Sequence, residues 1–131
     1  MELRETLQKL FDRSFSGMRA QGFKRAVDPN RNYSSCQYLS AEGLRCAVGQ
    51  LIDGLDDLHW ANNNGSVEDL FDVGENRLFR SIGIDRPADE DDRLDVVLFL
   101  RELQTVHDDY DDADIERGMR DMAKDHRLTV P

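Results

Sequence analysis

Hydrophobic residues recur at helical spacing from the start of the chain to Gly22. Their period predicts a long amphipathic helix over about residues 2–21, because side chains three or four positions apart share one face of a helix. Gly22 is a natural stop for this helix. The apolar stripe consists of Leu3, Leu7, Leu10, Phe11, Phe15 and Met18.

Two further helices are predicted towards the C-terminus. From Arg93 onward the apolar residues return to helical spacing, and residues 96–100 are apolar without interruption. A helix that is apolar around most of its circumference is typically buried, so this one is predicted to be central. The pattern breaks at residues 108–114. A last amphipathic helix follows, marked by Ile115, Met119, Met122 and Ala123.

The segment that contains both cysteines has a different pattern. Residues 34–39 and 44–48 flank a Ser-Ala-Glu-Gly turn that ends at Gly43, and glycine takes the positive φ that a bulged hairpin turn needs. This arrangement predicts a small β-hairpin. In such a hairpin Cys36 and Cys46 lie opposite each other, with their thiols close together.

Short helices are predicted between residues 53 and 83, with Ser66 as an N-cap. The acidic residues 89–92 fall in the first turn of the next helix, where the helix dipole favours negative charge. The sequence therefore predicts a single domain over residues 1–131 with an α+β fold that is mainly α. Its order is a long N-terminal helix, a small β-hairpin, short helices and two C-terminal helices.

Acidic residues outnumber basic ones, with 27 Asp and Glu against 17 Lys and Arg and a formal net charge of −10. Free nucleic acid is a poor partner for such a surface, because phosphate binding needs clustered Lys and Arg. Basic proteins, including those that themselves bind nucleic acid, are attracted to it. The acidic residues are concentrated: residues 51–75 hold seven of them and no Lys or Arg.

The sequence also bears on location. No apolar run approaches the length of a membrane span, and the N-terminus has no signal-like stretch. Two cysteines do not make the disulfide framework of a secreted domain. We therefore expect a protein of the cytosol that makes no contact with a membrane.

Three side chains are candidates for chemistry: Cys36, Cys46 and His107. A thiol at a helix start favours its thiolate, and a histidine can act as its base. Asp108 directly follows His107, so it is not expected to orient the ring. The cysteines and histidines lack the spacing of a structural zinc site. A small enzyme or a zinc protein built on these three residues stays open as an alternative, but no cofactor and no catalytic residue is predicted.

Two motifs carry a resemblance. Residues 36–52 read C-x-Y-x4-G-x2-C-A-V-G-x-L-I, and residues 103–108 read L-Q-x2-H-D. Together they resemble a loose group of small phage and prophage proteins of mostly unassigned function. The resemblance implies a phage or prophage origin and no particular reaction. We hypothesise that the two motifs form one structural unit, in which His107 forms a hydrogen bond with a loop carbonyl.

The leading functional hypothesis is a binding protein that inhibits a host factor in the host cytosol. A nucleic-acid-handling defence complex suits an acidic inhibitor, because carboxylates can occupy its phosphate-binding grooves. An anti-CRISPR or other anti-defence protein acting as a nucleic-acid mimic is the type expected. An accessory homo-oligomer is also compatible with the sequence. The predicted partner-binding residues are Asp53, Asp56, Asp57, Trp60, Glu68, Asp69, Asp72, Asp108, Asp109, Asp111, Asp112 and Asp114.

Overall fold

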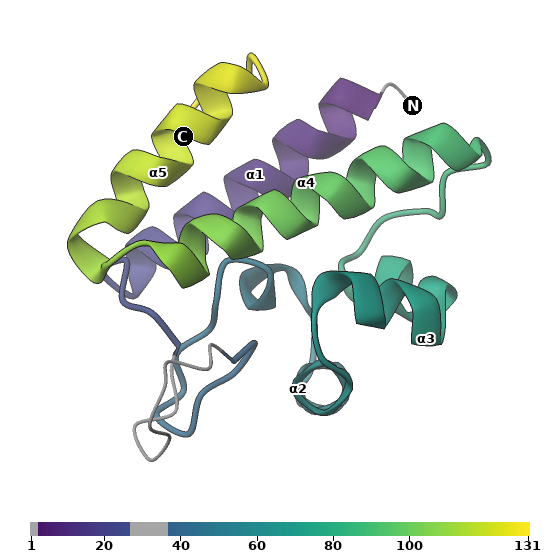
Figure 1. The fold of residues 1–131 in the computed structure, drawn as a ribbon, viewed down its shortest axis with the longest axis horizontal. Helices are drawn as coiled ribbons and strands as arrows, with labels where there is room; N and C mark the ends of the chain where they lie inside the picture. The colour runs from purple at the N-terminus through teal and green to yellow at the C-terminus, as the bar shows by residue number, and fades with distance from the viewer. Residues whose placement is uncertain (1–2, 27–36) are drawn as a thin grey trace.

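The computed structural model describes residues 3–26 and 37–131, and within these ranges the regular elements are all helical (Figure 1). Five α-helices and one short 3₁₀ helix follow one another along the chain. Their bounds are α1 Leu3–Ala20, η1 Gly49–Leu51, α2 Leu55–Asn64, α3 Val67–Ser81, α4 Glu90–Asp109 and α5 Asp112–Asp125. The long N-terminal helix and the two C-terminal helices predicted from sequence are confirmed.

The predicted β-hairpin is wrong for the described residues, which contain no β-strand. One antiparallel bridge joins Leu39 to Arg45 around the predicted turn, where Gly43 has a φ of +86°. The pairing stops there because Asn62 of α2 takes the neighbouring backbone groups. Its Oδ1 accepts from the Tyr38 N–H at 2.8 Å, and its Nδ2 donates to the Leu39 carbonyl at 2.8 Å. Cys36, and with it the predicted pairing of thiols, lies outside the described residues.

Helix α4 is the central helix, as its apolar run predicted. It packs against α1, α3 and α5, and Figure 1 shows it running beside α1 with α2 and α3 on the other side. Val96, Val97, Phe99 and Leu100 are buried, whereas Leu98 keeps 55% of its surface exposed. The helix therefore has one solvent-facing stripe despite its continuous apolar sequence.

Helix α3 runs antiparallel to α4, as the order of the two ion pairs between them shows. Glu68 lies 3.6 Å from Arg101, and Glu75 lies 3.1 Å from Arg93. Ser66 caps α3 as predicted: its hydroxyl accepts from the backbone N–H of Asp69 in a capping box. Within the described part of the chain, none of the helices is long and apolar enough to cross a bilayer.

Candidate functional site

Cys46 is fully buried beneath the turn. Its Sγ accepts a hydrogen bond from the backbone N–H of Gly49 at 3.2 Å. Burial raises the pKa of the Cys46 thiol to about 12, and the hydrogen bonds from Gly49 and Val48, which favour the thiolate, do not offset it. A neutral, inaccessible thiol is a poor nucleophile and a poor metal ligand. The structure gives Cys46 a packing role.

His107 is also fully buried, and both of its ring nitrogens are engaged. Nε2 accepts from the backbone N–H of Ala26 at 3.1 Å, and Nδ1 lies 3.1 Å from Oδ1 of Asp108. An acceptor Nε2 places the ring proton on Nδ1, which donates it to Asp108. The hypothesis of a bond to a loop carbonyl is therefore wrong, because the loop offers an N–H. Asp108 does orient the ring, since its side chain folds back along α4.

Other groups near the end of α4 also bind one another or the segment after α1. Asp108 Oδ1 also accepts from Gln104 Nε2 at 3.2 Å, and Arg25 donates to the Asp108 carbonyl. The backbone N–H of Arg25 donates to Asp112 Oδ1 at 3.0 Å. These contacts hold residues 24–26 against the α4–α5 junction. Among the described residues, no three His, Cys, Asp or Glu side chains converge as a metal site.

The burial of Cys46 leads to a labelling prediction. In a Cys36→Ser background at about pH 8, a thiol reagent should leave native Cys46 unmodified over the time in which an unfolded control reacts completely. The reagent needs a thiolate, and burial raises the pKa of Cys46 to about 12. Absorbance of the released chromophore, with and without denaturant, provides the measurement. Rapid labelling of the folded protein would restore Cys46 as a reactive thiol.

Most of the acidic residues predicted to bind a partner are engaged within the protein. The engaged carboxylates are Asp53 with Arg13, Asp57 with Arg77, Glu68 with Arg101, Asp69 with Ser66, Asp108 with His107, Asp112 with Arg25 and Asp114 with Arg117. The other four, Asp56, Asp72, Asp109 and Asp111, form no ion pair with a described residue. A partner's Arg or Lys must compete for the first group but not for the second.

Trp60 is half-buried, and its ring packs inside the protein. The Arg77 guanidinium lies 4.8 Å from the ring centroid, and a Cβ added at Gly74 would come within 3.0 Å of the ring. Arg77 also donates to Asp57 at 2.9 Å, so one arginine connects the tryptophan and the carboxylate. Trp60 thus helps to join α2 to α3.

Residues 85–95 form a different acidic segment, whose carboxylates have no ion-pair partner among the described residues. It holds six Asp and Glu and only two Arg. Both arginines bind Glu75 of α3: Arg86 at 2.9 Å and Arg93 at 3.1 Å. None of the six carboxylates forms an ion pair with a described residue. The predicted position of residues 89–92 at a helix start is confirmed, since Asp89 is the N-cap of α4 and the next three acids fall in its first turn.

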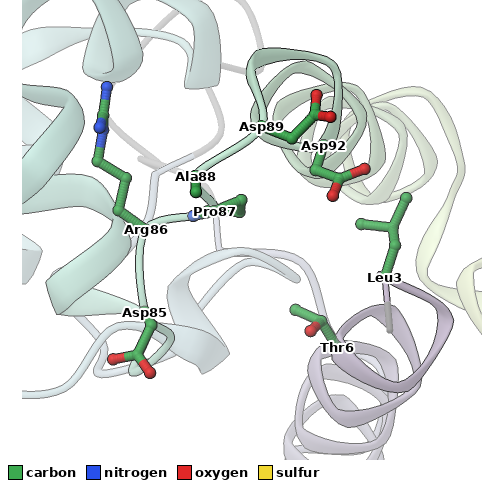
Figure 2. A pocket seen from close by; sticks show the side chains of 8 residues that line it. All are labelled: Leu3, Thr6, Asp85, Arg86, Pro87, Ala88, Asp89 and Asp92. Atoms are coloured by element: carbon green, nitrogen blue, oxygen red, sulfur yellow. The ribbon is translucent and has the colours of Figure 1, made fainter. Parts of the chain in front are cut away.

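A cavity of about 400 Å³ opens at this segment, between the start of α1 and the start of α4 (Figure 2). Leu3 and the Pro87–Ala88 pair supply apolar surface, and Asp85, Asp89 and Asp92 supply carboxylates. Figure 2 shows the Arg86 side chain leading away from Leu3, in agreement with its bond to Glu75. The cavity therefore combines a hydrophobic floor with carboxylates that form no ion pair with a described residue.

Comparisons with protein-family models, with curated proteins and with solved structures give no match to this chain. The candidate site consequently rests on its own geometry and charge.

Proposed function

We propose that this protein binds a basic surface on a partner protein and keeps nucleic acid away from that surface. The observation that carries the proposal is the 85–95 segment, whose carboxylates are free of intramolecular ion pairs with the described residues. Such carboxylates can accept hydrogen bonds from the Lys and Arg side chains that otherwise hold phosphate groups. A formal net charge of −10 adds long-range attraction, which accelerates encounter with a basic partner.

The 85–95 segment suits this role better than residues 53–72 and 108–114, because none of its six acids forms an ion pair with a described residue, whereas most of the eleven acids of the other two segments are engaged. A partner that binds Asp57 or Asp112 must first displace Arg77 or Arg25, and breaking an existing ion pair offsets the gain from forming a new one. Asp85 and Asp92 require no such exchange.

The proposed partner class follows from the charge and from the two motifs. In a phage or prophage setting the partner is a host factor that handles nucleic acid, and we place a CRISPR effector or another defence complex in this class. The protein then acts in the host cytosol as an inhibitor. The small-enzyme and zinc alternatives gain no support from the buried Cys46 thiol or from His107, whose two nitrogens are engaged.

Affinity capture tests the proposal. The immobilised protein is incubated with nuclease-treated bacterial lysate, washed at low or high salt, and then challenged with duplex DNA or RNA. We expect capture of a nucleic-acid-binding protein that is lost as salt rises and is displaced by nucleic acid, because both ligands compete for one basic surface. Capture that resists both treatments would contradict nucleic-acid mimicry.

A further inference from the structure

We propose that the cavity between α1 and α4 is a pocket for one arginine side chain of the partner. This inference rests on the proposed function and names the contact that gives it specificity. The occupant inserts its aliphatic stem over Pro87 and Ala88 and donates from its guanidinium group to Asp92. Asp85 lies across the cavity, where its carboxylate adds attraction at longer range (Figure 2).

The shape of the cavity suits a long side chain. Its volume of about 400 Å³ lies in the range of small-ligand sites, which start near about 300 Å³. Leu3 comes from the first turn of α1, whereas Asp92 comes from the first turn of α4, so the pocket forms where two helix starts meet (Figure 2). An apolar floor between carboxylates matches the two parts of arginine, an aliphatic stem and a charged head.

The charges at the cavity select a cation. Among the described residues that line it, Arg86 is the only basic one, and its Nε is bound to Glu75 at 2.9 Å. The start of α4, which otherwise attracts anions, is already capped: Asp89 Oδ1 accepts from the Asp91 N–H at 2.7 Å. Asp85 and Asp92 form no hydrogen bond or ion pair with described residues, so their oxygens remain available as acceptors.

Arginine fits this pocket better than lysine. Its planar fork presents several N–H donors at fixed angles, so it can bind the Asp92 carboxylate with two hydrogen bonds while it lies flat on an apolar surface. Lysine is a point charge that is more strongly hydrated, and it gains less from the apolar floor.

Amide NMR spectra of the whole protein provide the test, with a short neutral-ended peptide that carries one arginine as the probe. The same peptide with citrulline, a neutral side chain of nearly the same shape, is the control. The arginine peptide should shift the amides of Leu3, Ala88 and Asp92, and citrulline should lower the affinity at least about tenfold. Equal binding of the two peptides would overturn the proposal.

Two kinds of variant locate the binding. Asp85→Asn/Asp92→Asn should weaken the arginine peptide about tenfold, whereas Asp109→Asn/Asp111→Asn removes the same charge at the other end of α4 and should leave it unchanged. That helix has 20 residues, so its ends lie about 30 Å apart. Ala88→Leu fills the cavity without changing its charge and should also block binding. Amide shifts spread over all acidic segments would show diffuse attraction instead of a pocket. Unchanged affinity of Ala88→Leu for the arginine peptide would show the same.

The outcomes separate this inference from the proposed function. If lysate capture stays salt-sensitive but the arginine peptide does not bind the cavity, the pocket is wrong and the broader proposal stands. If the peptide binds the cavity but no nucleic-acid-displaceable protein is captured, the pocket is an arginine site and the proposed function is wrong.

Discussion

Gly49→Ala should lower the free energy of unfolding by about 3 kcal/mol, which is the upper range for overpacking a core. An ideal Cβ at residue 49 would lie 2.1 Å from the carbonyl oxygen of Tyr38 and 2.9 Å from its carbonyl carbon. This oxygen cannot move away easily. Asn62 binds the backbone on both sides of it, and the Tyr38 hydroxyl donates to the Gly65 carbonyl at 2.9 Å.

Gly43→Ala is the matched control for this prediction. Gly43 has a φ of +86°, but a Cβ there meets nothing within 4 Å, so the substitution costs only backbone strain of about 1 kcal/mol. Urea denaturation followed by circular dichroism measures both variants. If Gly49→Ala lowered the free energy of unfolding no more than Gly43→Ala does, residue 49 would not lie as close to the Tyr38 carbonyl as the structure shows.

His107→Ala should destabilise the protein by about 3 kcal/mol. The substitution leaves a cavity at a fully buried site, and it leaves the backbone N–H of Ala26, a buried residue, without an acceptor. It also removes one donor from Asp108. In hydrogen-exchange measurements the Ala26 amide should lose its protection, a change that a cavity alone does not require.

His59→Ala provides the control for the histidine prediction. His59 is exposed on α2, and its replacement should change the free energy of unfolding by less than about 0.5 kcal/mol. Equal stability of the two variants, or an Ala26 amide that stays protected in His107→Ala, would show that the ring does not hold the segment after α1.

Features that depend on local spacing could be predicted from the sequence. The stripe from Leu3 to Met18 and the apolar run at 96–100 identified α1 and α4, because helical periodicity is set by neighbours along the chain. The Ser66 cap followed from the same local chemistry. The hairpin failed because its outcome depends on Asn62, which lies 24 residues from Tyr38 and accepts from the Tyr38 N–H that the next rung of the hairpin would need.

The candidate site depends on contacts between distant residues. The sequence therefore could not show which acids are neutralised by an arginine of the same chain and which are available to a partner. Asp57 and Asp92 look alike in a charge count, yet Arg77, 20 positions along the chain from Asp57, neutralises only the first. Glu75 occupies both arginines of the 85–95 segment for the same reason. The local excess of six acids over two bases can be counted in the sequence. The helix dipole alone accounts for the acids at 89–92, so the count does not by itself indicate a binding site.

The central claim is that the carboxylates of residues 85–95, which form no ion pair with a described residue, bind the partner, and that total charge does not suffice. Capture from lysate with two charge-matched variants tests it most directly. The account predicts that Asp85→Asn/Asp92→Asn loses most of the nucleic-acid-displaceable capture while Asp109→Asn/Asp111→Asn keeps it. Equal capture by the two variants, whether retained or lost, would contradict the claim.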